Sequence, residues 1–182
     1  MNYTEEELIA GCKRRSAKHE EVFYKKYYGY VMGISLSYSK DKALADEITN
    51  DSFMKFFGSI KKFDDFQSVK AWLRRITVNT AIDYFRKQKK FQNHTDVAEE
   101  TGVFHEVSAL QDLAFQDIIN LINLLQEDHK MVFNLYEIEG YSHKEIGEKL
   151  GLTESSSRVY LARAKSELRK LVSIHLKEYE GR

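Results

Sequence analysis

The chain has 182 residues, of which 42% are hydrophobic, so it is long enough for one domain or two small ones with packed cores. It contains no proline, which favours uninterrupted helices, and its single cysteine, Cys12, excludes an internal disulfide framework and fits the reducing cytoplasm. The acidic N-terminus and the lack of a long apolar stretch predict neither a signal peptide nor a membrane span.

Charge is balanced overall, with 28 basic and 28 acidic side chains, but it is unevenly distributed. Residues 70–92 carry seven basic and one acidic side chain, and residues 140–182 carry nine and six. Between them, residues 93–139 carry one basic and ten acidic side chains. Two basic segments suggest two nucleic-acid surfaces. The acidic segment could keep these surfaces from binding unselectively, and a solvated linker and helix surface explains it at least as well.

The N-terminal part of the chain predicts three helices. Thr4 and Glu7 have the spacing of a capping box, which starts a first helix that runs to about Lys13. Aromatic side chains at helical spacing over 17–38 predict a second helix that packs them inward. Asp41 opens a third helix over 41–57, and Gly58 is expected to end it. Residues 59–68 are predicted to form a loop that carries Phe63 and Phe66.

The third helix carries an acidic patch of Asp46, Glu47, Asn50 and Asp51. Such a patch would repel DNA, so a functional role requires a basic protein partner. An ordinary solvated helix face explains the same residues.

The helix predicted over 69–90 presents a mixed stripe. Within an arc of about 80° on a helical wheel it holds one aromatic, one amide, one acid and three cations. These residues are Trp72, Arg75, Asn79, Asp83, Arg86 and Lys90. A stacking surface beside an amide and positive charge suits unpaired bases and phosphates. A core tryptophan beside a solvated basic stripe is an equally good interpretation.

Residues 93–108 lack a consistent period and predict an extended acidic linker. Helical periodicity resumes at about Ala109 and continues to Leu125, and Glu127 and Asp128 are expected to interrupt it. A further helix over 130–139 should end at Gly140.

Residues 141–171 predict two helices joined by a tight turn. Ser142 and Glu145 form a capping box, Gly151 suits a left-handed helix end, and Thr153 can cap the next helix. The inner face of that helix is predicted from residues four and three apart: Ser157, Leu161, Ala164, Leu168 and Leu171. Its outer face is small, polar and basic, as a recognition helix in the major groove requires. An ordinary helical hairpin is the alternative.

No catalytic constellation is visible. The six histidines are scattered, and neither a metal-ligand spacing nor a phosphate-binding glycine loop occurs. We therefore expect no metal, no cofactor, no small-molecule substrate and no enzymatic activity.

The two halves together resemble one family. The run from Lys70 to Lys87 resembles the Trp-Leu-x-x-Ile-x-x-Asn-x-x-x-Asp-x-x-Arg pattern of the extracytoplasmic-function (ECF) sigma factors of the sigma-70 family. Residues 45–53 resemble the polymerase-binding helix of that group, and the C-terminal hairpin resembles its region 4. The resemblance covers about residues 17–176. It implies an all-α chain with region 2 over 1–92, a flexible acidic linker over 93–108, and region 4 over 109–182.

The resemblance also implies a cytoplasmic protein with partners and site residues. Region 2 would bind the clamp helices of the polymerase β′ subunit and melt the −10 element, and region 4 would contact the β flap and read the −35 element. An anti-sigma factor would hold the protein inactive. The implied polymerase-binding residues are Asp46, Glu47, Asn50, Asp51 and Phe53. The implied −10 residues are Phe63, Phe66, Trp72, Arg75, Asn79, Asp83 and Arg86, with the 59–68 loop as the pocket for a flipped base. The implied −35 residues are Ser155, Ser156, Arg158, Val159, Ala162, Arg163 and Lys165.

Three positions depart from the family pattern. Asn50 replaces the commoner glutamine, Ser157 stands where an apolar residue usually packs, and Glu127-Asp128 replaces a proline. The alternative to a sigma factor is a free-standing helix-turn-helix regulator, which should bind duplex DNA without polymerase, usually as a dimer on two half-sites.

Overall fold

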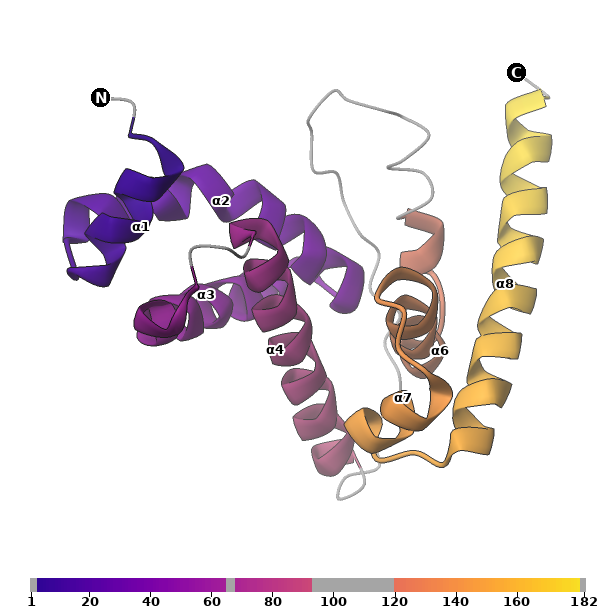
Figure 1. The fold of residues 1–182 in the computed structure, drawn as a ribbon. Coiled ribbons are helices and arrows are strands. Elements are labelled where there is room, and N and C mark those ends of the chain that lie inside the picture. Colours follow the sequence, from indigo (N-terminus) through magenta and orange to yellow (C-terminus); the bar gives the residue numbers. More distant parts are fainter. Residues whose placement is uncertain (1–2, 65–67, 93–119, 181–182) are drawn as a thin grey trace. The chain divides into compact units, whose positions relative to one another are not determined.

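The computed structural model describes residues 3–64, 68–92 and 120–180, and all regular structure in these ranges is helical, as predicted (Figure 1). The chain divides into two compact units, Met1–Lys87 and Gln88–Arg182. In the first unit, the helices are α1 (Glu5–Lys13), α2 (Ala17–Tyr38), α3 (Lys42–Ser59), the 3-10 helix η1 (Ile60–Lys62) and most of α4 (Val69–Gln92). In the second, residues 120–123 are helical, and they are followed by α6 (Glu127–Phe133), the π-helical turn η2 (Asn134–Ile138), α7 (His143–Leu150) and α8 (Glu154–Glu180).

Local capping starts α1 and α3 where the sequence predicts them. The Thr4 hydroxyl accepts from the backbone N–H of Glu7, and the Glu7 carboxylate accepts from the backbone N–H of Thr4, which completes the capping box of α1. The Asp41 carboxylate accepts from the N–H of Leu44 at the start of α3. These bonds satisfy backbone donors that have no partner within their helix.

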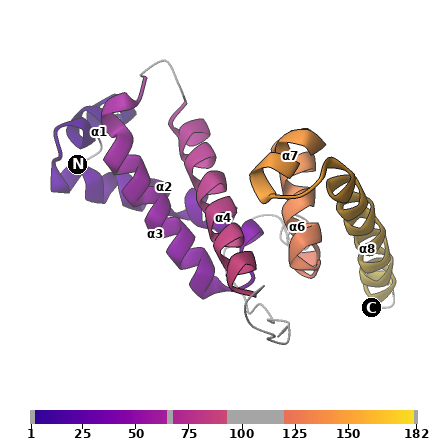
Figure 2. The ribbon, with the colours of Figure 1, turned by 90° about the horizontal axis from the view of Figure 1, so that it is seen from below.

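The core of the first unit is largely aromatic. Helices α2 and α3 lie side by side, and α1 packs on α2 and on η1 (Figure 2). Phe23 of α2 stacks on Phe56 of α3 with ring centroids 4.6 Å apart, and both side chains are 0% exposed. Such pairs add to the free energy gained by burying apolar area. The prediction that the aromatics of the second helix turn inward is confirmed for Phe23, Tyr27 and Tyr38.

The second unit has its own core and its own helix signals. Ser142 and Glu145 form the predicted capping box of α7, and Gly151 ends α7 in the left-handed region with φ of 71°. Thr153 accepts from the N–H of Ser156 and so caps α8. Buried side chains from α6, α7, α8 and the turn after α6 fill the space between these helices: Met131, Val132, Leu135, Ile146, Leu161 and Ala164.

Three helix boundaries differ from the prediction. Helix α3 continues through Gly58 to Ser59, and η1 follows inside the segment predicted as a loop. A glycine in a helix costs only about 0.5–1 kcal/mol, which the packing of Phe56 and Ile60 outweighs. The predicted interruption is present but lies at residues 124–126, and Glu127 and Asp128 form the first turn of α6. The predicted linker 93–108, and residues 109–119 of the following helix, lie outside the described residues.

Candidate functional site

The acidic patch of α3 is held from both sides by tyrosine hydroxyls. Tyr24 of α2 donates to Asn50 Oδ1 at 3.1 Å, and Tyr28 of α2 donates to Asp46 Oδ1 at 3.3 Å. Tyr84 of α4 donates to Asp51 Oδ2 at 2.8 Å. Asp46 also pairs with Lys42 at 2.8 Å, and Glu47 is exposed. We call Asp46, Glu47, Asn50 and Asp51, together with these tyrosines, the acidic face.

The protonation of these tyrosines fixes the direction of the bonds. Burial and the neighbouring Asp51 carboxylate raise the pKa of Tyr84 to about 12. Burial and then Asp46 raise the pKa of Tyr28 as well. Both phenols therefore stay protonated at neutral pH and donate to the carboxylate oxygens. Sequence reasoning missed the bonds of Tyr24 and Tyr28 because aromatics at helical spacing indicate only packing, and no local pattern singled out Tyr84.

Phe53, implied to bind polymerase, lies in the core with 2% of its surface exposed. Its ring packs against Tyr24 at 4.5 Å and Phe57 at 6.1 Å. In this conformation it supports the acidic face from beneath, and its side chain is not open to a partner.

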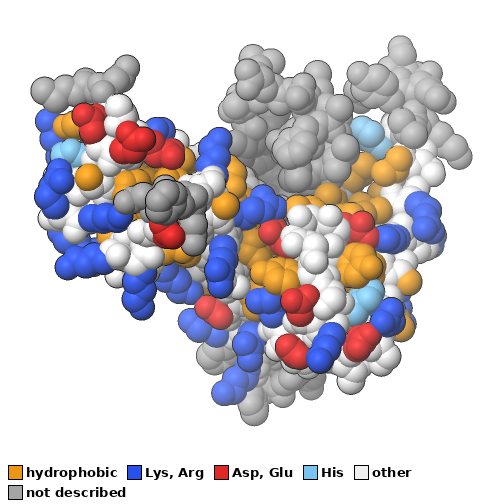
Figure 3. Space-filling view, in the orientation of Figure 1, with side chains coloured by type: hydrophobic (Ala, Val, Ile, Leu, Met, Phe, Trp, Pro, Cys, Tyr) orange, Lys and Arg blue, Asp and Glu red, His pale blue; other side chains and the backbone are white. Residues whose placement is uncertain are grey.

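The cations of the α4 stripe are exposed to solvent, and its acid forms an ion pair with a neighbouring helix. Arg75 and Arg86 are exposed, and Asn79 is partly exposed. Figure 3 shows Lys and Arg side chains along α4 toward its C-terminal end. Asp83 pairs with Lys55 of α3 at 3.0 Å, so its charge is offset within the unit. The exposed part of the stripe thus holds a partly exposed amide, the cations of Arg75, Arg86 and Lys90, and the ion-paired Asp83.

The aromatic end of the stripe belongs partly to the core. Trp72 lies 5.1 Å from Phe56 and 5.1 Å from Phe63, measured between ring centroids, and is partly buried. Phe63 is only 6% exposed. Phe66 lies outside the described residues. The structure therefore brings Trp72 and Phe63 together at one end of α4, with Arg75 and Asn79 following along the helix.

The α7–α8 turn depends on a close backbone approach at Gly147. A Cβ atom at this position would lie 2.7 Å from the carbonyl oxygen of Leu152, so only glycine allows the observed turn. Ser157, the polar residue on the inner face of α8, is 0% exposed and is hydrogen-bonded through its hydroxyl to His143 Nδ1 at 3.0 Å. This bond satisfies the buried hydroxyl and joins the starts of α7 and α8.

His143 is a residue that sequence reasoning did not select. Its ring stacks on Tyr136 with centroids 4.5 Å apart. Burial lowers the pKa of His143, and the nearby positive charge of Arg158 lowers it further. The neutral ring is therefore favoured, which suits its bond to Ser157.

The outer face of α8 is exposed as predicted. Ser155, Arg158, Val159, Ala162 and Arg163 are exposed, and Ser156 and Lys165 are partly exposed. Arg158 pairs with Glu154 one turn earlier, and Lys165 pairs with Glu137 at 2.6 Å. Short side chains thus alternate with cations along one side of the helix.

Two further classes of site do not occur in the described part of the chain. No group of three or more His, Cys, Asp or Glu side chains there is placed to hold a metal ion. Nor does any of its helices combine the length and apolar character that crossing a bilayer requires.

Comparisons with known proteins agree with this arrangement. Residues 23–91 match the family model described as Sigma-70 region 2, and residues 115–168 match that described as Sigma-70, region 4. The ECF RNA polymerase sigma factor SigM of Bacillus subtilis is 29% identical over 81% of this chain and 91% of its own. The ECF RNA polymerase sigma-E factor of Haemophilus influenzae is 25% identical over 89% and 92%.

A solved structure shares the fold. It is that of the sigma factor RpoE from Bartonella quintana, determined in complex with the anti-sigma factor NepR. The match has a TM-score of 0.55 and covers 85% of this chain and 98% of that one. At 20% sequence identity, the likeness is one of fold.

Proposed function

The chain belongs to the ECF group of the sigma-70 family, and from this premise we propose which of its surfaces bind polymerase, the −10 element and the −35 element. A sigma factor is a non-catalytic specificity subunit of RNA polymerase, and it directs promoter-specific transcription initiation. The domain limits we propose are 1–92 for region 2, 93–108 for the linker and 109–182 for region 4.

The acidic face of α3 is the proposed polymerase-binding surface. The proposal rests on the hydrogen bonds that order this face. Three side chains of the face accept bonds from tyrosines of two other helices. A charged patch that is already ordered loses less side-chain entropy when it binds. Its partner should be basic, which fits the β′ clamp helices. Asp46, Glu47, Asn50 and Asp51 make the contact, and Phe53 supports the helix from the core.

The stripe of α4 is the proposed −10 surface. Asn79 offers an amide for base edges, and Arg75 and Arg86 offer cations for phosphates. Flipping a base out of the stack costs a few kcal/mol, which Trp72 and the 59–68 loop would offset by stacking. Because Phe63 is 6% exposed, a base can reach its ring only if neighbouring side chains shift. Asp83 contributes through its ion pair with Lys55.

The outer face of α8 is the proposed −35 surface. Ser155, Val159 and Ala162 allow close approach to the major groove. Arg158, Arg163 and Lys165 reach phosphates or guanine edges, and Ser156 lies beside them near the start of the helix. Region 4 also contacts the β flap of polymerase. We further propose that the protein acts in the cytoplasm and is restrained there by an anti-sigma factor.

The test is binding to purified RNA polymerase core, measured by size-exclusion co-elution. The wild-type chain should co-elute, and a variant with Asp46→Lys, Glu47→Lys and Asp51→Lys should not. A control with Glu6→Lys, Glu21→Lys and Glu148→Lys changes net charge equally at exposed acids elsewhere and should still co-elute. Failure of the folded wild-type chain to co-elute would favour a free-standing helix-turn-helix regulator, which duplex DNA binding without polymerase would then reveal.

A further inference from the structure

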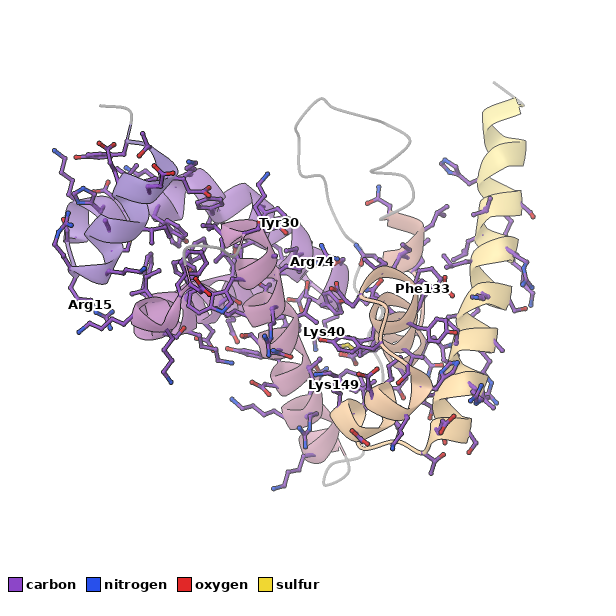
Figure 4. All side chains as sticks on the ribbon, in the orientation of Figure 1. Arg15, Tyr30, Lys40, Arg74, Phe133 and Lys149 are labelled. Atoms are coloured by element: carbon purple, nitrogen blue, oxygen red, sulfur yellow. The ribbon has the colours of Figure 1, made fainter. Side chains whose placement is uncertain are left out.

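A second concentration of positive charge lies at the turn between α1 and α2. Arg14 and Arg15 are exposed there, and Lys61 and Lys62 of η1 are exposed on the segment that α1 contacts. We call these four residues the basic platform. Arg15 is labelled in Figure 4, and Figure 3 shows Lys and Arg side chains gathered at the same end of the unit. The acids of α1, Glu5 to Glu7, occupy the first turn at its other end.

The backbone at Arg15 is unusual for a residue with a side chain. Its N–H donates to Cys12 O at 2.9 Å, and the N–H of Ser16 donates to Gly11 O at 3.1 Å. This is the Schellman pattern, in which the residue at the position of Arg15 adopts a left-handed conformation and is usually glycine. Arg15 has φ of 60°, and the other described residues with positive φ are Gly140 and Gly151.

Helix electrostatics explain only part of the platform. Cations near a helix C-terminus interact favourably with the helix dipole, which accounts for Arg14 and for the lysines that end η1. The dipole does not require arginine at the strained position, because glycine would relieve the strain and Arg14 would still supply charge. A strained residue kept in an exposed place points to a role for its side chain.

The surroundings of the platform indicate what that role is. Lys13 Nζ lies 5.9 Å from the centroid of the Phe63 ring, so the end of α1 adjoins the aromatic end of the −10 surface. Phe63 in turn contacts Trp72 of α4. Lys13, followed in the chain by Arg14 and Arg15, thus brings positive charge next to these aromatics, and the exposed Asp64 is the described acid beside Phe63. A groove that combines aromatics with cations is typical of single-strand binding.

We propose that the basic platform binds the phosphates of the single DNA strand that occupies the −10 surface. This inference rests on the proposed function, because that function supplies the melted strand. Guanidinium and ammonium groups that neutralise phosphates release counterions, so each contact should appear in the salt dependence of binding. The contacts carry no sequence information and hold the strand in place.

The test compares full-length variants on a fluorescent 20-nucleotide oligo(dT) across a series of salt concentrations. Arg15→Gly and the pair Lys61→Gln with Lys62→Gln should bind more weakly. The slope of log K against log salt should fall by about 0.7 for each phosphate that is no longer neutralised. Lys40→Gln is the matched control, because Lys40 lies beyond the far end of the 22-residue α2 and is labelled in Figure 4. The affinity and salt slope of Lys40→Gln should equal those of the wild type.

Stability separates a DNA contact from a structural role. Arg15→Gly removes the strain, so its unfolding midpoint should equal or exceed that of the wild type while its affinity falls. Three outcomes would each overturn the proposal. The salt slopes of both platform variants could equal that of the wild type, or the wild-type chain could fail to bind oligo(dT). The variants could also bind more weakly only to a 20-base-pair duplex. A lower unfolding midpoint in Arg15→Gly, together with wild-type affinity and salt dependence in the Lys61→Gln/Lys62→Gln variant, would also overturn it. Co-elution with polymerase tests the proposed function separately.

Discussion

At the scale of single residues, the tyrosine hydroxyls distinguish the acidic face from an ordinary charged helix surface. Each hydroxyl joins a group on α3 to a neighbouring helix, so the carboxylates are oriented before any partner arrives. An exposed carboxylate would otherwise sample several rotamers, and fixing it upon binding costs free energy.

Removing the hydroxyls should therefore weaken polymerase binding without unfolding the chain. We expect the double variant Tyr28→Phe/Tyr84→Phe to lose about 0.5–1 kcal/mol of binding free energy, roughly two- to fivefold in affinity. The control is Tyr30→Phe, whose hydroxyl donates to the carbonyl oxygen of Lys70 at 3.2 Å rather than to the acidic face. Titration of polymerase core by fluorescence anisotropy measures the difference. Equal affinities for the double variant and the control would contradict the role of the hydroxyls.

His143 is a residue through which pH should affect the second unit. Its pKa in the folded chain lies below the ordinary value of 6.5, because burial and Arg158 disfavour the charged ring and Lys165 adds to this, while Glu154 opposes it. The unfolded chain then binds more protons between the two pKa values. The contribution of His143 to the free energy of unfolding is therefore fully present above pH 6.5 and is lost as the pH drops through the folded pKa.

We accordingly expect faster amide hydrogen exchange in residues 142–164 at low pH, after correction for intrinsic rates, than at neutral pH. In His143→Gln, which lacks the titrating ring, the change with pH should be smaller. The α2 helix of the same sample is an internal reference. If wild type and variant respond to pH identically, another group is responsible.

At the scale of elements, the α7–α8 turn is specified by a glycine and by a polar pair. Gly147 permits the close approach of the Leu152 carbonyl, and the Ser157–His143 bond replaces the apolar contact usual in the family. A buried hydroxyl without a partner would cost about 1–3 kcal/mol, so this bond explains how serine is tolerated there.

Gly147→Ala should lower the free energy of unfolding by about 1–3 kcal/mol, because the obstructing atom is backbone and cannot rotate away. Gly33→Ala is the matched control, since a Cβ at Gly33 meets no atom within 4 Å. Alanine there should instead stabilise the helix by about 0.5–1 kcal/mol. Urea denaturation followed by circular dichroism compares the two. Equal stability of Gly147→Ala and the wild type would show that the turn relaxes.

Helix starts could be predicted from the sequence because their signals are local. The capping boxes of Thr4 and Ser142 each lie within four residues, and the structure has both. Gly58 misled the prediction because packing of neighbouring side chains decides whether a glycine ends a helix. The tyrosine bonds and the Lys55–Asp83 pair join residues 18 to 33 positions apart, and no local pattern reports them. Arg15 was missed because its conformation, rather than its type, is unusual.

At the scale of the whole molecule, each unit has a separate core. Phe23, Phe53 and Phe56 are fully or almost fully buried in the first unit, and Val132, Leu135 and Ile146 in the second. The region 2 match over residues 23–91 lies mostly in the first unit, and the region 4 match over residues 115–168 lies in the second. The helices of each unit are therefore stabilised by the core of that unit.

We expect the two units to unfold independently. Phe56→Ala should destabilise the first unit by about 3–5 kcal/mol, since this side chain is 0% exposed. Hydrogen exchange measured by mass spectrometry should then show reduced protection in α2 and α3 and unchanged protection in α7 and the first half of α8. Simultaneous reduction in both units would indicate a single cooperative fold.

The π-helical turn at the end of α6 has a consequence for chain length. The N–H of Glu139 donates to Asn134 O at 3.0 Å, five residues back rather than four, so the turn holds one more residue than a regular helix would. Deleting one residue would restore regular winding, whereas the same deletion in a regular helix would rotate all that follows by about 100°. Residues 134–138 are thus a place where the gene could lose a codon and leave the faces of α7 and α8 in phase.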